Sequence, residues 1–135
     1  MKFLLDTNIC IYMFKGLYGL PARISTVGFD EFAISEITLA ELIFGAYKSK
    51  QIERNLSVVN EFSQNIAILP IIGALDFYGR EKARLQSLGQ PIGDLDLLIG
   101  STALANNMIV VTRNVREFQR IQNLNVENWV DSDLS

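Results

Sequence analysis

The sequence predicts an α/β layer fold, in which a short and mostly parallel sheet carries helices on both faces. Residues 108–112 form a continuous β-branched apolar run, which is typical of a strand buried on both faces of a parallel sheet. Longer segments between such runs repeat their apolar residues three and four positions apart, the period of an amphipathic helix. With 135 residues, 49% of them hydrophobic, the chain can bury the core of one domain over residues 1–135.

The first half of the chain alternates short apolar runs with helical patterns. We expect strands at residues 2–5 and 32–34, and helices at residues 9–14, from residue 38 onward, and at residues 52–64. Thr38 followed by Glu41 matches a capping box, so Thr38 is the expected N-cap of the middle helix. Asp6 directly follows the first strand and precedes a helix, which is also a capping position.

The second half of the chain continues the same alternation. We expect strands at residues 67–70, 108–112 and 126–130, and helices at residues 76–88 and 95–106. Asp94 is the expected N-cap of the last of these helices. In open α/β folds the functional site lies outside the carboxyl ends of the strands, and this rule selects Asp6 and the turn at residues 112–114.

The composition excludes several mechanisms. The chain has 12 basic and 15 acidic residues and no histidine, which excludes Ser–His hydrolysis, histidine acid–base catalysis and histidine-ligated zinc. The net charge of −3 disfavours loose adhesion to nucleic acid over the whole surface. A single cysteine, an apolar start that already ends at Asp6 and no apolar run of about 18 residues predict a soluble, cytoplasmic protein.

Several acidic residues interrupt apolar surroundings. Asp96 is flanked by apolar residues at 95 and 97–99 and has no basic neighbour in the sequence. A carboxylate there is costly unless it is capped, paired or bound to a cation. If several such carboxylates converge, a site of oxygen ligands favours Mg²⁺ or Mn²⁺, and water activated by that metal is the natural nucleophile for phosphodiester hydrolysis. Taken singly, each acid is better explained by a structural role, as a helix cap or as a first-turn charge that complements the helix dipole.

Four motifs, in this order, resemble the PIN-domain ribonucleases, and more narrowly the VapC toxins of type II toxin–antitoxin systems. The motifs are Phe3-Leu4-Leu5-Asp6-Thr7-Asn8, Thr38-Leu39-Ala40-Glu41-Leu42, Pro91-Ile92-Gly93-Asp94-Leu95-Asp96-Leu97-Leu98-Ile99, and Val110-Val111-Thr112-Arg113-Asn114 followed by Glu117-Phe118. The similarity covers essentially the whole chain. It implies a PIN-like three-layer fold and a metal-dependent endoribonuclease.

The resemblance also implies roles for individual residues. Asp6, Glu41 and Asp96 are the expected metal ligands, with Glu41 reaching in from the first turn of its helix. Residues expected to orient these carboxylates are Thr7, Asn8, Asp94 and Thr112. Asp94 lies half a helical turn from Asp96, so the two side chains are expected to diverge. Asn114 stands where many members of the family have a fourth acid; it can hold a water or the scissile phosphate but brings no charge.

The expected partners are RNA, an antitoxin and a second copy of the chain. Arg113, Arg116 and Arg120 share one face if their segment is helical, and they are candidates for RNA contact as much as for a solvated face. The family often cuts transfer RNA, and it implies a VapB-like antitoxin, a homodimer and a higher assembly with the antitoxin, without a membrane partner.

Two alternatives remain open on the sequence. One is a catalytically weak or inactive PIN-like binding module that acts through its dimer and its partner. The other is a phospho-acceptor signalling domain with an acidic pocket. That class needs a lysine after a late strand, whereas Thr112 is followed by Arg113.

Overall fold

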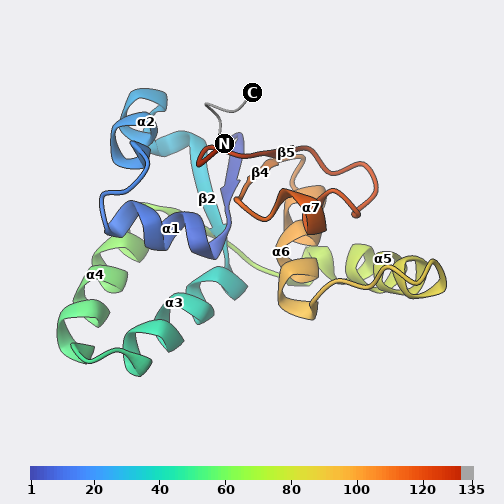
Figure 1. Cartoon of the computed structure of the whole chain (residues 1–135), viewed down its shortest axis with the longest axis horizontal. Coiled ribbons are helices and arrows are strands. Elements are labelled where there is room, and N and C mark those ends of the chain that lie inside the picture. Colours follow the sequence, from blue (N-terminus) through green and yellow to red (C-terminus); the bar gives the residue numbers. More distant parts are fainter. Residues whose placement is uncertain (132–135) are drawn as a thin grey trace.

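A five-stranded parallel sheet forms the centre of the computed structural model, which describes residues 1–131 (Figure 1). The strands are β1 (Phe3–Leu5), β2 (Phe32–Ser35), β3 (Ala67–Leu69), β4 (Ile109–Val111) and β5 (Val126–Glu127). Their order across the sheet is β3-β2-β1-β4-β5, and every neighbouring pair is parallel. The expected parallel α/β fold is therefore confirmed.

Helices cover both faces of this sheet. They are α1 (Thr7–Phe14), α2 (Leu20–Val27), α3 (Glu36–Lys48), α4 (Ile52–Asn65), α5 (Leu75–Ser87), α6 (Asp94–Ala105) and α7 (Val115–Phe118), with short 3-10 turns at Phe29–Glu31 and Ile72–Ala74. In Figure 1, α1 to α4 lie on one side of the sheet and α5 to α7 on the other. No helix within residues 1–131 is long and apolar enough to cross a membrane.

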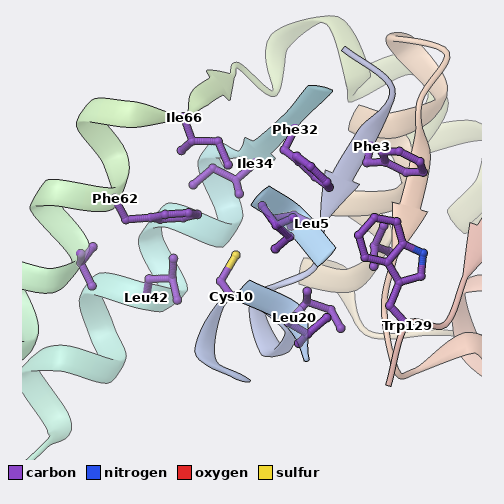
Figure 2. Close-up of a cluster of buried hydrophobic side chains, with 14 of the residues drawn as sticks. Phe3, Leu5, Cys10, Leu20, Phe32, Ile34, Leu42, Phe62, Ile66 and Trp129 are labelled. Carbon is purple, nitrogen blue, oxygen red and sulfur yellow. The ribbon is translucent and has the colours of Figure 1, made fainter. Parts of the chain in front are cut away.

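Alternation of side chains along the strands produces two cores. Phe3, Leu5 and Phe32 point to the face covered by α1 to α4, where they pack with Trp129 and Cys10 (Figure 2). Leu4, Ala33 and Val110 point to the opposite face and pack against α5, α6 and α7. Both faces of the central strands are therefore buried, which explains their uninterrupted apolar sequences.

The structure corrects two helix starts. The N-cap of α3 is Ser35, whose Oγ accepts a hydrogen bond from Ile37 N at 3.0 Å, so Thr38 lies inside the helix and the expected capping box is wrong. The N-cap of α6 is Gly93, which makes no side-chain capping bond, so the expectation that Asp94 caps the helix is also wrong. Helix α2 was not expected from the sequence, and β5 ends at Glu127, short of the expected residue 130.

A tight approach at Gly100 makes a stability prediction. A Cβ added there would overlap Ile121 Cδ1, and Ile121 is fully buried, so Gly100→Ala should lower the free energy of unfolding by about 1–3 kcal/mol. Gly79 in α5 has nothing within 4 Å of an added Cβ, so Gly79→Ala should stabilise by roughly 0.5–1 kcal/mol. Urea unfolding measures both; equal stabilisation would contradict the close packing of α6 on residues 118–124.

Candidate functional site

Asp6 lies at the carboxyl end of the central strand and is 4% exposed. Its Oδ1 accepts a hydrogen bond from Thr7 N at 2.8 Å, as the N-cap of α1, and its Oδ2 accepts one from Thr112 Oγ1 at 2.7 Å. Burial raises the pKa of Asp6, the two hydrogen bonds lower it, and the nearby charge of Glu41 raises it again, with a net upward shift. Asp6 thus caps α1, and burial at the same time disfavours the ionised form of its side chain.

Glu41 comes to the same edge of the sheet from α3. Because α3 begins at Glu36, Glu41 lies in its second turn, one turn later than expected. Its Oε1 accepts a hydrogen bond from Thr7 Oγ1 at 2.5 Å, and Thr7 Oγ1 lies 3.3 Å from Thr38 Oγ1. Thr7 therefore holds Glu41 by its side chain and Asp6 by its backbone, as the expected orienting residue would.

Asp96 lies half-buried in the first turn of α6 and faces the other acids. Its pKa is raised to about 6, first by desolvation and then by the negative charges of Asp6, Glu117 and Glu41. A hydrogen bond between the carboxyl groups of Asp96 and Glu117 raises it further by stabilising the protonated form. We call Asp6, Glu41, Asp96 and Glu117 the carboxylate cluster.

Glu117 is the member of this cluster that the sequence did not single out. It lies in α7, which follows β4, three residues after Asn114. In the family pattern the fourth acid is expected at position 114, directly after the strand, and this chain has an asparagine there. The signal was an acid in the first turn of the next helix, in the motif Glu117-Phe118 that already formed part of the resemblance.

The structure separates Asp94 from Asp96, as the helical spacing predicts. Asp94 Oδ1 accepts hydrogen bonds from Tyr78 Oη at 2.9 Å and from Lys82 Nζ at 2.9 Å. These bonds lower the pKa of Asp94. Asp94 therefore turns to α5 and takes partners other than the carboxylate cluster.

Within the described chain, Asn8 and Asn114 make no side-chain hydrogen bond to the carboxylate cluster. Asn114 is half-buried, and its backbone N–H donates to Thr112 Oγ1 at 2.9 Å. Thr112 thus links the turn after β4 to Asp6. Asn8 is exposed in the first turn of α1.

The three arginines do not share a helix face, because α7 covers only Val115–Phe118. Arg113 lies against Tyr12 and Tyr18, and its Nε is 3.5 Å from Asp131 Oδ2. Arg120 donates to the carbonyl of Pro91 at 3.0 Å, while Arg116 is exposed. The expectation of one arginine face is therefore wrong.

Within residues 1–131, the carboxylate cluster has no basic side chain paired with it. Of the ion pairs within residues 1–131, none includes Asp6, Glu41, Asp96 or Glu117. With the side chains as they stand in the described chain, no three histidine, cysteine or acidic residues are close enough to ligate one ion. The donor chemistry nevertheless suits a hard divalent cation, since all donors are carboxylate oxygens that raise one another's pKa.

Comparison with known proteins identifies the family of this chain. The PIN domain family matches residues 3–124. The tRNA(fMet)-specific endonuclease VapC of Shigella flexneri is 38% identical over 130 residues, which cover 96% of this chain and 98% of that protein. Ribonuclease VapC2 of Rickettsia felis is 41% identical over 137 residues, with coverage of 96% and 98%.

A solved structure extends the agreement to the fold. The crystal structure of DNA-bound VapBC from Salmonella typhimurium contains a chain with a TM-score of 0.89 and 39% identity to this one, covering 96% of this chain and 98% of that chain. Family match, identity and fold coincide over nearly the full length. The chain therefore belongs to the PIN-domain family, and within it to the VapC ribonucleases.

Proposed function

We propose that this chain is an endoribonuclease toxin that hydrolyses RNA phosphodiester bonds with a Mg²⁺ or Mn²⁺ ion held by Asp6, Glu41 and Asp96. The observation that carries this proposal is a group of four acids that gathers at the carboxyl edge of the sheet and forms no ion pair within residues 1–131. Such mutual repulsion is relieved when a divalent cation binds.

The donor chemistry of these three residues suits that ion, and Glu117 is a fourth acid of the carboxylate cluster. A bound divalent cation supplies charge neutralisation at the phosphate and lowers the pKa of water. Thr112 and Thr7 hold the carboxylates of Asp6 and Glu41 in fixed orientations through their hydroxyl groups. Without a cation, desolvation and the neighbouring acids raise the pKa of Asp96 to about 6, and a bound divalent cation would offset that repulsion.

The proposed substrate is a transfer RNA. The relative from Shigella flexneri is named for cleavage of tRNA(fMet), and the similarity between the two chains covers nearly the full length of both. We take the anticodon hairpin of tRNA(fMet) as the first substrate to test. Its cleavage by this chain would occur in the cytoplasm, where transfer RNA is found.

The proposed partner is a VapB-like antitoxin, because the similar solved structure is a VapBC complex. A groove of about 730 Å³ runs from Glu41 between α1, α3 and α4, with apolar walls at Phe14 and Val59 and basic residues at Lys15 and Lys50. An apolar antitoxin segment that carries an acidic flank suits this groove. It would block the approach to Glu41 while it is bound.

We also propose a homodimer, with a higher assembly when antitoxin is bound. Phe44 and Tyr47 are 65% and 60% exposed on α3 and offer an apolar surface that a second copy would cover. Light scattering after size exclusion measures this: we expect twice the monomer mass for the wild type. A monomer at micromolar concentration would contradict the dimer.

The function is tested by sequencing RNA ends after brief expression of the wild type and of Asp6→Asn. We expect new ends at one or few sites with the wild type only. The purified protein should cut the anticodon hairpin with Mg²⁺ or Mn²⁺ and stop when the metal is chelated. A metal titration followed by thermal unfolding separates this function from an inactive binding module, because a working site is stabilised by the ion it binds.

Thr112 supplies a further prediction about the site. Thr112→Val removes the hydroxyl that donates to Asp6, so we expect cleavage to fall by about 10- to 100-fold. Thr112→Ser keeps the hydroxyl and should retain most of the activity. Cleavage rates of the two purified variants on the same hairpin provide the measurement, and equal rates would exclude the proposed orienting role.

A further inference from the structure

Two tyrosine rings and one guanidinium group meet on the surface of the protein, next in the chain to residues of the site. The rings of Tyr12 and Tyr18 pack edge to face, with centroids 5.1 Å apart. The Arg113 guanidinium lies 5.9 Å and 5.5 Å from the two ring centroids, and Arg113 Nη1 is 3.5 Å and 3.4 Å from their hydroxyl oxygens. We call Tyr12, Tyr18 and Arg113 the aromatic–arginine cluster.

This cluster is joined to the site by the chain itself. Arg113 directly follows Thr112, whose hydroxyl holds Asp6, and Tyr12 lies in α1, the helix that Asp6 caps. The Cα atoms of consecutive residues are about 3.8 Å apart, so the Arg113 backbone cannot be far from the Asp6 carboxylate. Arg113 thus connects the aromatic–arginine cluster along the backbone to the residue that holds Asp6.

The backbone at Tyr18 is held in an unfavourable conformation. Its φ angle is 59°, between two glycines with positive φ, Gly16 at 70° and Gly19 at 65°. A bulky side chain rarely adopts this region, because its Cβ crowds the backbone there. Tyr18 is nevertheless 49% exposed, so burial of its ring does not explain the strain. Its ring is instead presented beside Tyr12 and Arg113.

Aromatic rings and guanidinium planes are the groups on which proteins stack unpaired nucleobases. Arg113 keeps a solvent-accessible side chain, and its contact with Asp131 at 3.5 Å is longer than a strong bidentate pair. We propose that the aromatic–arginine cluster stacks one unpaired base of the RNA, next to the phosphate that is cut. This inference rests on the proposed function and adds a base-binding subsite to it.

The test is a double-mutant cycle between protein and RNA. The probes are the anticodon hairpin of tRNA(fMet) and copies of it in which one loop nucleotide at a time is abasic. Fluorescence anisotropy measures binding to the cleavage-deficient Asp6→Asn protein and to the same protein carrying Tyr18→Leu. At one loop position, we expect loss of the base to weaken binding by about 5- to 100-fold when the tyrosine is present and by less than about twofold when Tyr18→Leu has removed it.

Two further variants keep the test informative if Tyr18→Leu is unstable. Tyr18→Phe keeps the ring and should keep the position-specific penalty, whereas Arg113→Lys keeps the charge without the planar group and should reduce the penalty. Phe29→Leu is the matched control, because Phe29 is an exposed ring that precedes β2 at the amino edge of the sheet, opposite the carboxylate cluster. It should leave RNA binding unchanged.

The outcomes separate the two proposals. The inference is overturned if the wild type cuts the hairpin but Tyr18→Leu changes the penalty for an abasic nucleotide equally at every loop position, or at none. The aromatic–arginine cluster would then have only a structural role. If the wild type cuts no RNA and Asp6→Asn binds none, the proposed function fails, and the base-binding subsite fails with it. A penalty confined to one position and dependent on the Tyr18 ring supports both.

Discussion

An Asp6→Asn variant is expected to remain folded and to lose RNA cleavage by roughly a thousandfold, which corresponds to about 4 kcal/mol of transition-state stabilisation. Asparagine keeps an oxygen that can accept from Thr7 N or Thr112 Oγ1, so the cap of α1 can survive. It cannot carry the negative charge that a divalent cation needs. The substitution is therefore expected to remove the metal-binding charge and to leave the fold of α1 intact.

The measurement compares initial cleavage rates of the anticodon hairpin at saturating Mg²⁺, together with thermal unfolding of each protein. Asp76→Asn is the control, because Asp76 lies on α5 in an exposed ion pair with Arg80 and such pairs contribute about 0–1 kcal/mol. It should cleave like the wild type. Full Mg²⁺-dependent cleavage by folded Asp6→Asn would contradict the site assignment.

The sequence predicted the sheet better than the ends of the helices. Strands β1, β2 and β4 are continuous apolar runs buried on both faces, and such runs have few alternative structures. Helix α2 was missed because Gly16 and Gly19 precede it and indicate a loop, although Pro21 in its first turn is also a helix-start signal. The start of α3 was misplaced because Ser35 and Thr38 are both good caps, and tertiary packing selects between them.

The part of the site that lies at the ends of the strands could be predicted, because the order of the strands fixes which residues meet there. Asp6 and Thr112 follow adjacent parallel strands, so the carboxyl edge of the sheet brings them together whatever the side chains do. The pairing of Asp96 with Glu117 depends on how α6 and α7 pack, a contact between helices that no local pattern encodes. The same holds for Arg113 and the two tyrosines, which are about a hundred residues apart along the chain.

Asp96→Asn is expected to abolish cleavage and, without metal, to stabilise the protein at neutral pH. Folding raises the pKa of Asp96 from 3.8 to about 6, so the folded state disfavours its ionised form. The stability that this group contributes is fully present below about pH 3.8 and is lost as the pH rises through 6. At pH 7 the half-buried carboxylate should cost about 1–2 kcal/mol after allowance for solvent screening, and asparagine removes that cost.

Asp94→Asn provides a control of opposite sign on the same helix turn. The hydrogen bonds from Lys82 and Tyr78 lower the pKa of Asp94, so its stabilising contribution is present above pH 3.8 and lost as the pH falls. Urea unfolding at pH 4 and pH 7 without metal should therefore show Asp96→Asn gaining stability over the wild type only at pH 7. Asp94→Asn should show a small loss at pH 7.

Addition of Mg²⁺ should reverse the ranking between Asp96→Asn and the wild type. A ligand that binds only the folded state stabilises it in proportion to its affinity, and the wild type retains the full set of acids. The wild type should then rise in melting temperature with increasing Mg²⁺ or Mn²⁺, while Asp96→Asn should change little. If Asp96→Asn instead melts below the wild type at pH 7 without metal, Asp96 stabilises α6 as a first-turn acid, and repulsion within the carboxylate cluster is not what dominates its energetics.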